Sequence, residues 1–359
     1  MQSLSITSSM KRKFEMSTNN EKYLITGATG FIGSHLAKDL VEKGKSIKCL
    51  VRRSSPEASI KFLSGLGAEL VYGDLIDEKS LMEAVKGVGT VFHLGGGGRV
   101  DMPEDVCFRI NVDGTRNLLE ACLRQGGVER FIHVSTCGVM GDVQNPPADE
   151  TYPYNPENMA YARAKTETEK TALSYRDRLS VRVVRFPLAY GSPLIDGDLS
   201  QIEGVTPMSM IFSAVQKGQW MYFGDGMTLI HCIHVDDIVC GVELAAEKGK
   251  TGEVYILADE KAVPMKTLVE ISAKALNVPA PRRHIPLPVA MTMALLMEAV
   301  ARLTRRKPML TREVVRGFTA TRAFNTSKAR RELGFQPAFR LEEGIQETVK
   351  YYQKRGYIQ

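Results

Sequence analysis

Short apolar runs rich in β-branched and aromatic residues alternate with amphipathic stretches of helical period between residues 23 and 186. Strands that alternate with helices form βαβ units, and their parallel sheet is covered on both faces. The pattern therefore predicts an α/β fold with a doubly wound parallel sheet, whose ligands bind beyond the carboxyl ends of the strands. The predicted strands are Tyr23–Thr26, Ile47–Val51, Glu69–Tyr72, Thr90–Leu94, Arg130–Ser135 and Val181–Phe186, and the predicted helices are Phe31–Lys43, Glu78–Val85, Val106–Arg124 and Ala160–Tyr175.

The first strand–helix junction carries three glycines, in the segment TGATGFIG at residues 26–33. Glycines let the backbone turn tightly and approach a pyrophosphate, and free N–H groups at the start of the helix favour an anion. Ala28 replaces the middle glycine of the ordinary dinucleotide motif, so a tight turn without a ligand is the alternative. The place at the first junction favours a dinucleotide. The residues predicted to hold its pyrophosphate are Gly27, Thr29, Gly30, Phe31, Ile32 and Gly33.

Beyond residue 186 the alternation ends, and residues 187–231 are predicted as loops around one helix, Met208–Lys217. A helix, Val235–Glu247, and a strand, Glu253–Leu257, then return to the sheet. We expect three parts: a disordered leader at 1–21, a dinucleotide-binding Rossmann domain at 22–186 plus 232–257, and a smaller, discontinuous C-terminal substrate domain at 187–231 plus 258–359.

Two arginines, Arg52 and Arg53, follow the second strand where NAD enzymes usually place an acid. A guanidinium suits a 2′-phosphate because its planar fork makes charge-assisted bidentate bonds. Two solvated arginines are the alternative, but the missing acid favours NADP(H), with NAD less favoured. Asp74 and Leu75, at the end of the third strand, are expected to contact the cofactor. The Asp74 carboxylate would accept a bond from the adenine amino group, cap the next helix, or both.

Tyr161 and Lys165 occupy positions i and i+4 of a predicted helix, so their side chains share one face. A lysine ammonium one turn away favours the phenolate and brings a tyrosine nearer to acid–base work at neutral pH. By itself, a Tyr and a Lys at this spacing often occur by chance as two surface residues of a helix. A partner hydroxyl follows the fifth strand at Ser135 and Thr136, where one of the two is expected only to form the turn.

No metal is expected, because the histidines lack ligand spacing and no H-E-x-x-H motif is present. His93 and His133 are predicted to be strand residues with hydrogen-bonding neighbours.

From about Lys22 to Tyr352 the sequence resembles the extended short-chain dehydrogenase/reductases, and its C-terminal part resembles their 3β-hydroxysteroid dehydrogenase and dihydroflavonol-reductase-like branch. The matching motifs are TGATGFIG (26–33), GDL (73–75), VFHL (91–94), NVDGTRNLLEAC (111–122), VSTCGVMG (134–141), YARAK (161–165), RFPLAYG (185–191), HVDD (234–237) and ARRELGF (329–335).

The resemblance implies an NAD(P)-dependent enzyme acting on CH–OH groups, with Thr136, Tyr161 and Lys165 as its catalytic residues. It also implies a homodimer built from the helices over Val106–Arg124 and Ala160–Tyr175. Further cofactor contacts are implied at Leu94, Gly95, Gly96, Asn111, Ser135, Pro187 and Leu188. Substrate contacts are expected at Arg99, Thr136, Cys137, Gly138, Met210, Ile211, Trp220 and Ile230.

The sequence departs from the family pattern in two places. Four consecutive glycines, Gly95–Gly98, follow VFHL and should make that loop mobile. Ile230 and His231 occupy the place of an Arg-Asp pair typical of the nucleotide-sugar members, which weakens a sugar-diphosphate substrate. Methionines and aromatic residues between 208 and 230 instead favour a bulky apolar ligand, although many of them are expected to be core.

The segment 288–306 is apolar, rich in methionine and ends in basic residues. We expect a core helix or a lid over the pocket; peripheral contact with a membrane interface is the alternative, and Glu298 argues against a span.

The predicted function is reversible hydride transfer between NADP(H) and a hydroxyl or ketone on a steroid-, isoprenoid- or polyketide-like molecule. A nucleotide-sugar epimerase or dehydratase is the second hypothesis, and a non-catalytic NADP-sensing binding protein is the third. The net charge of +6 is spread along the chain without interleaved aromatic residues, so nucleic acid is not an expected partner. With no secretory signal and no cysteine framework, the predicted location is the cytoplasm.

Overall fold

The computed structural model of the chain describes residues 21–97, 102–156, 160–195, 206–304, 308 and 310–358. The predicted leader therefore lies outside the described residues, except for its last residue, Glu21. This residue belongs to the fold and not to a leader, because its carboxylate accepts a hydrogen bond from Thr90 and forms an ion pair with Arg130.

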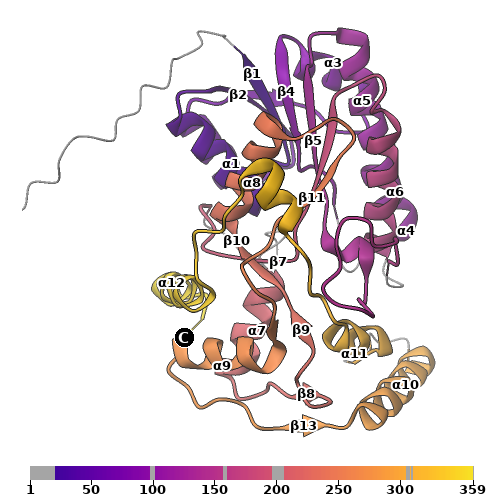
Figure 1. Cartoon of the computed structure of the whole chain (residues 1–359), viewed down its shortest axis with the longest axis vertical. Helices are drawn as coiled ribbons and strands as arrows, with labels where there is room; N and C mark the ends of the chain where they lie inside the picture. Colours follow the sequence, from indigo (N-terminus) through magenta and orange to yellow (C-terminus); the bar gives the residue numbers. More distant parts are fainter. Residues whose placement is uncertain are drawn as a thin grey trace, which may run out of the picture.

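A seven-stranded sheet forms the upper half of the molecule in the view of Figure 1, with the strand order β11-β6-β5-β4-β1-β2-β3 and parallel pairing throughout. The chain runs outward from β1 to β3 and then restarts at β4 in the other direction. The predicted doubly wound sheet is thus confirmed, and β1 and β4 flank its switch point. The strands are β1 (Lys22–Thr26), β2 (Ser46–Val51), β3 (Glu69–Tyr72), β4 (Val88–His93), β5 (Arg130–Val134), β6 (Val181–Arg185) and β11 (Val254–Ile256).

Helices cover both faces of the sheet because side chains alternate between two apolar cores along each strand. In β1, Ile25 packs into one core and Leu24 into the other. One face is covered by α1 (Phe31–Glu42), α2 (Glu57–Gly65) and α8 (Val235–Lys248), and the other by α3 (Glu78–Val85), α5 (Gly114–Gln125) and α6 (Ala160–Ser174). The predicted helix over Val106–Arg124 is a longer segment with an internal π-helical turn: α4 (Glu104–Phe108), Arg109–Asp113 and α5.

The smaller half of the molecule contains short strands that the sequence did not predict. Residues 187–231, predicted as loops around one helix, also contain β7 (Leu188–Tyr190), β8 (Tyr222–Phe223) and β9 (Leu229–Ile230). Strands of two or three residues carry no measurable alternation, which is why the pattern missed them. The other elements are α7 (Thr206–Gln216), β10 (Cys232–His234), β12 (Val263–Pro264), α9 (Met265–Ala275), β13 (His284–Ile285), α10 (Leu287–Thr304), α11 (Arg312–Thr319) and α12 (Leu341–Lys354).

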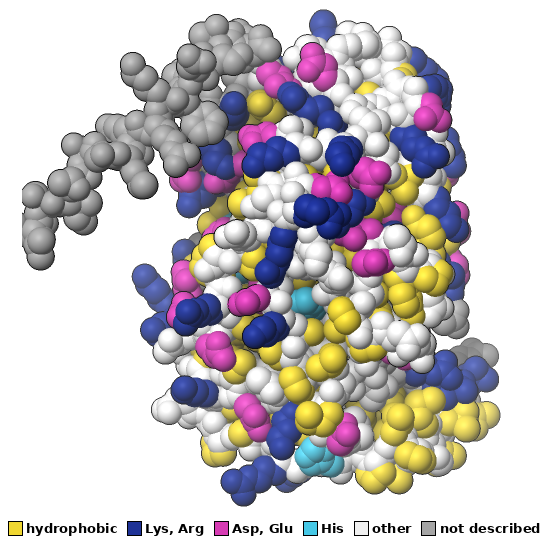
Figure 2. Space-filling view, in the orientation of Figure 1, with side chains coloured by type: hydrophobic (Ala, Val, Ile, Leu, Met, Phe, Trp, Pro, Cys, Tyr) yellow, Lys and Arg dark blue, Asp and Glu magenta, His cyan; other side chains and the backbone are white. Residues whose placement is uncertain are grey.

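The expectation of a core helix within 288–306 is wrong. Of the 18 residues of α10, only Ala290 and Ala294 are buried. Figure 2 shows hydrophobic side chains gathered at the lower right of the molecule, where Figure 1 places α10.

Candidate active site

The glycine-rich junction between β1 and α1 has the shape of a pyrophosphate cradle. Gly27 has a φ of +75°, and a Cβ there would lie 2.8 Å from the Leu94 backbone. A Cβ on Gly33 would lie 2.2 Å from the Gly27 carbonyl oxygen. No side chain caps α1, so its first N–H groups face outward for an anion. These residues fit a dinucleotide, whereas the Phe31 side chain packs in the core and leaves only its backbone for contact.

The adenine end of the site lies beyond β2 and β3. Arg52 and Arg53 are exposed, and the Arg53 guanidinium lies 5.8 Å from the centre of the Tyr72 ring. Asp74 does not cap the next helix, because its Oδ1 accepts from the N–H of Ile76 while Asp77 caps α3.

The loop after β4 is fastened to its neighbours in the part that the structure describes. The Gly95 N–H donates to Thr26 Oγ1, and Asn111 Nδ2 donates to the Gly97 carbonyl oxygen at 2.7 Å. Leu75, predicted at the cofactor, is buried in the core, and its carbonyl oxygen accepts from Asn117. Asn111 therefore holds the loop, and its buried Oδ1 has no hydrogen-bond partner among the described residues.

Two of the three predicted catalytic residues, Thr136 and Lys165, lie at the carboxyl end of β5. Tyr161 and Lys165 lie on consecutive turns of α6, and Lys165 Nζ donates to the Val134 carbonyl oxygen at 3.1 Å. Thr136 follows two residues later, and its Oγ1 accepts from the Gly138 N–H at 3.1 Å. This bond occupies a lone pair of the Thr136 hydroxyl and leaves its proton available to a substrate oxygen.

The Ser135 hydroxyl points into a buried polar network that sequence reasoning missed. It donates to Glu169 Oε2 at 2.6 Å, and Tyr154 donates to Glu169 Oε1 at 2.9 Å. Arg185, at the end of β6, donates three hydrogen bonds to the same carboxylate, which is fully buried. Burial, with the Glu169 charge, raises the pKa of Tyr154 to about 12. Glu169 is one helical turn beyond Lys165, so the network anchors the helix that carries Tyr161.

Two buried histidines lie beside Lys165 in the sheet. His93 is hydrogen-bonded as predicted, through Nδ1 to Thr26 and through Nε2 to Thr115. Burial lowers the pKa of His93 to about 3, and the Lys165 ammonium acts in the same direction. The prediction is wrong for His133, because neither ring nitrogen has a partner among the described residues. Burial and the Lys165 charge hold the pKa of His133 well below its usual value, so both rings are neutral.

The predicted substrate contacts are not brought together. Ile211 and Cys137 are core residues, whereas Met210 is 59% exposed on the surface of α7. Ile230 is buried in β9, and Arg99 lies outside the described residues. Pro187 and Leu188 are partly exposed beyond β6.

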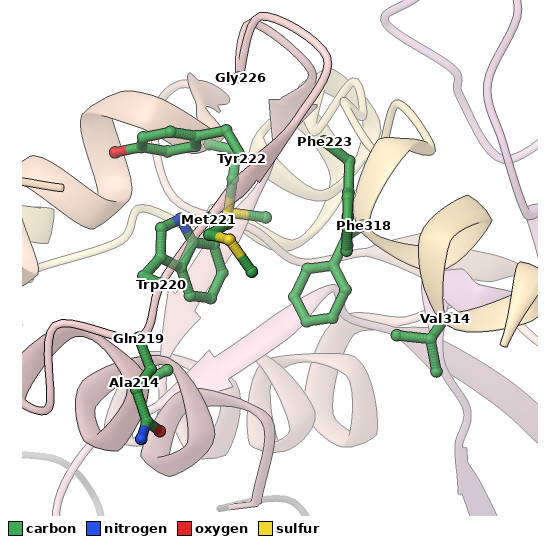
Figure 3. Close-up of a pocket in the computed structure, with 10 residues that line it drawn as sticks. Ala214, Gln219, Trp220, Met221, Tyr222, Phe223, Gly226, Val314 and Phe318 are labelled. Atoms are coloured by element: carbon green, nitrogen blue, oxygen red, sulfur yellow. The ribbon is translucent and has the colours of Figure 1, made fainter. Parts of the chain in front are cut away.

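Trp220 does line a pocket, a cavity of about 180 Å³ between α7, β8 and α11. Figure 3 shows that Trp220, Phe223 and Phe318 converge there, with the Trp220 and Phe318 ring centres 5.6 Å apart. The buried Trp220 Nε1 has no hydrogen-bond partner among the described residues. The lining is mostly apolar but includes Gln219, and the buried Tyr222 hydroxyl likewise has no hydrogen-bond partner among the described residues. No residue of the predicted catalytic set lines this pocket.

His231, in the place of the Asp expected in nucleotide-sugar members, has both ring nitrogens hydrogen-bonded to the backbone. Its Nδ1 accepts from the Phe324 N–H, and Nε2 therefore carries the proton that it shares with the Asp259 carbonyl oxygen at 3.0 Å. Burial lowers the pKa of His231 to about 4. Arg322 pairs with Ile230 of β9, and its guanidinium donates to the Gly317 carbonyl oxygen at 2.6 Å. His231 is thus a neutral ring with no donor left for a phosphate.

Known proteins of similar sequence include a dehydrogenase, a reductase and an epimerase. The chain is 27% identical to sterol-4-alpha-carboxylate 3-dehydrogenase, decarboxylating, of Dictyostelium discoideum, over 90% of this chain and 98% of the other. It is 28% identical to 2-alkyl-3-oxoalkanoate reductase of Stenotrophomonas maltophilia, over 90% and 97%. It is also 27% identical to N-acetyl-alpha-D-glucosaminyl-diphospho-ditrans,octacis-undecaprenol 4-epimerase of Escherichia coli O157:H7, over 92% and 95%.

Among solved structures, that of gox2253 superposes with a TM-score of 0.79 at 30% identity, covering 94% of this chain and all of the other. Residues 23–258 match the sequence profile of the NAD dependent epimerase/dehydratase family. This match spans β1 to β11, the glycine cradle and the Tyr161/Lys165 helix. The chain therefore belongs to the NAD dependent epimerase/dehydratase family, within the extended short-chain dehydrogenase/reductases, and is an NAD(P)-dependent enzyme acting on CH–OH groups.

Proposed function

We propose that the chain is an NADP(H)-dependent oxidoreductase that interconverts a hydroxyl group and a ketone on a hydrophobic, steroid-, isoprenoid- or polyketide-like molecule. The observation that carries the substrate class is the state of Ile230 and His231, which offer no cation and no free donor to a diphosphate. A desolvated phosphate without donors is very unfavourable, whereas an apolar ligand gains about 25 cal/mol for each Å² buried. The names of the sterol and oxoalkanoate relatives agree with this class.

NADP selection is assigned to the exposed Arg52 and Arg53 beyond β2, where no acid is available to bind a ribose hydroxyl. NADP(H), when bound, supplies or accepts the hydride. Gly27, Gly30 and Gly33 would hold its pyrophosphate against the start of α1.

The chain's own residues handle the proton. The Tyr161 hydroxyl gives a proton to the oxygen of the ketone during reduction and takes it back during oxidation. The Lys165 ammonium, one turn away and held at the β5 end by the Val134 carbonyl oxygen, favours the phenolate. The Thr136 hydroxyl donates to the same substrate oxygen and fixes its position.

Titration calorimetry with the full chain in the presence of NADP separates the substrate classes. A steroid ketone should give a binding isotherm, and UDP-glucose should give none. Tight UDP-glucose binding without a ketone signal would instead support the epimerase hypothesis. If no ketone in a lipophilic panel is reduced by NADPH, although NADPH binds, the sensor hypothesis gains support.

We also propose a cytoplasmic homodimer formed through α5 and α6. The two helices pack against each other within one chain, and their outer residues, such as Arg116 and Lys170, are exposed and charged. Such a pairing would be polar, with the ion pairs of each subunit rearranged across it. Light scattering should give twice the chain mass at micromolar concentration, and a monomer would contradict the proposal.

A further inference from the structure

The helix α10 carries its apolar side chains on the outside of the protein. Its exposed large hydrophobic residues are Leu287, Val289, Met293, Leu295, Leu296, Met297, Val300 and Leu303, and Leu303 is 85% exposed. A monomeric soluble protein rarely leaves so many neighbouring apolar side chains in water. By length and composition α10 could also cross a membrane.

The exposed side of α10 is free of charge. At about 100° per residue, an arc of roughly 200° runs from Leu295 through Leu296 to Met297. The helix contains two charged residues, Glu298 and Arg302, and at 100° per residue both lie outside this arc. A helix that faces water presents charged and polar residues on its outer side. The outer face of α10 is instead composed for contact with an apolar phase.

The opposite side of α10 is fixed to the folded protein. Ala290 and Ala294 pack against Val315 of α11, and Glu298 forms an ion pair with Arg312 at 2.9 Å. A helix of 18 residues is about 27 Å long, close to the thickness of a bilayer core. Insertion across a membrane would strip α10 from α11 and carry Glu298 into hydrocarbon. Lying in the plane of an interface keeps both contacts and immerses only the outer face.

Exposed arginines flank α10 at both ends. Arg282 and Arg283 precede it beside β13, and Arg302 lies in its last turn. In Figure 2, dark-blue side chains lie along the upper edge of the apolar area at the lower right. This arrangement complements anionic headgroups, which attract cations near the surface. In an isologous pair of two copies along α10, cations would face cations at the helix ends whichever way the helices run. The charges thus favour a lipid surface over a second copy.

We propose that α10, with Arg282, Arg283 and Arg302, docks the protein onto the surface of an anionic lipid bilayer, with the helix axis parallel to the membrane. The proposal concerns a surface that contains none of the predicted catalytic or cofactor residues. It therefore stands independently of the proposed reaction.

The test is sedimentation of the full chain with sucrose-loaded vesicles of phosphatidylcholine alone or with phosphatidylglycerol. The chain should bind the mixed vesicles, and the bound fraction should fall as salt is raised. Leu296→Glu places a charge in the middle of the exposed face and should lower the partition coefficient by about tenfold or more. The control, Ile76→Glu, adds the same charge at a residue that is 44% exposed on the Rossmann half and should bind like the wild type after correction for net charge.

Circular dichroism melting shows whether the variants are folded, and the double variant Arg282→Gln/Arg283→Gln provides a second test that leaves α10 unchanged. This variant should bind the vesicles that contain phosphatidylglycerol less than the wild type does, and its binding to vesicles of phosphatidylcholine alone should not change. Wild-type protein that stays in the supernatant with both vesicle types would overturn the proposal, and so would equal binding of Leu296→Glu and Ile76→Glu. Self-association that Leu296→Glu abolishes, without vesicle binding by the wild type, would assign the face to a second copy. An enzyme inactive on every ketone that still binds vesicles would overturn the proposed function alone.

Discussion

The Rossmann half and the α10–α11 region place the same kinds of residue in opposite environments. Around β5 and β6, charged side chains are buried and paired, as Glu169 and Arg185 are, with at most 2% of either side chain exposed. On α10, leucines are exposed and the ion pair, Glu298–Arg312, lies near the surface. The difference teaches that burial in this chain follows local packing and not residue type. The first region holds charged side chains in fixed places between a helix and the sheet, and the second presents an apolar face to the outside.

The largest expected difference between the two regions is in the turnover rate of their variants. Tyr161→Phe removes only a hydroxyl, so the fold and NADPH binding should persist while kcat for a ketone falls by about 10²- to 10⁴-fold. Glu298→Gln, in the other region, should keep the wild-type rate. Steady-state NADPH oxidation and cofactor titration measure both. Substantial turnover by Tyr161→Phe would remove Tyr161 from the mechanism.

The buried and the surface ion pair should differ next in stability. Glu169→Gln leaves the buried Arg185 guanidinium without its counter-charge, which should lower the free energy of unfolding by about 3–5 kcal/mol. The isosteric change Glu298→Gln should leave the urea midpoint nearly unchanged, because ion pairs that are partly exposed to water contribute little and Gln keeps an oxygen to accept from the Arg312 N–H. Similar urea midpoints for the two variants would show that the buried ion pair contributes no more to stability than the one near the surface.

Two arginines with different neighbours test cofactor choice. Arg52→Ala should weaken NADPH binding by roughly 10- to 100-fold and leave NADH unchanged, because only NADPH carries the 2′-phosphate. Arg312→Ala should change neither dissociation constant. Fluorescence titration of both cofactors decides the matter, and an equal loss for NADPH and NADH would show that Arg52 does not discriminate.

The smallest expected effect concerns Asp259, which follows β11 where the two halves meet. Burial, and then the charge of Asp237, raises the pKa of Asp259 to about 8. Between the ordinary carboxyl pKa and this value the folded state holds a proton that the unfolded chain has released, so stability falls as pH rises. Asp259→Asn should therefore melt a few degrees above the wild type at pH 8 and show a smaller gain at pH 5. A difference that does not change with pH would mean that Asp259 is not the titrating group.

The helix that carries the predicted catalytic pair could be foreseen, but its anchor could not. Tyr161 and Lys165 are four residues apart, so their shared face follows from helical geometry alone. Glu169 and Arg185 lie on different elements, and only the packing of α6 against β6 brings them within hydrogen-bonding distance. An acid at i+4 from Lys165 and an arginine at the end of a buried strand were the available signals.

The residues predicted to contact the substrate were predicted least well. Composition does not show which side of a helix faces the core. Met210 and Ile211 are neighbours on α7, yet one is exposed and the other is core. The helix α2 was also missed, since it buries only Ser59 and Leu63 and so has almost no apolar period.

The sequence by itself determined the parallel sheet, the glycine-rich turn and the spacing of the predicted catalytic residues, because each depends on period, spacing or backbone freedom within a short segment. Tertiary structure decided the features that depend on distant neighbours: the Glu169–Arg185 anchor, the neutral state of His231 and the exposure of α10. An apolar helix is buried only where the rest of the chain supplies a surface to cover it, and here α11 covers a single stripe.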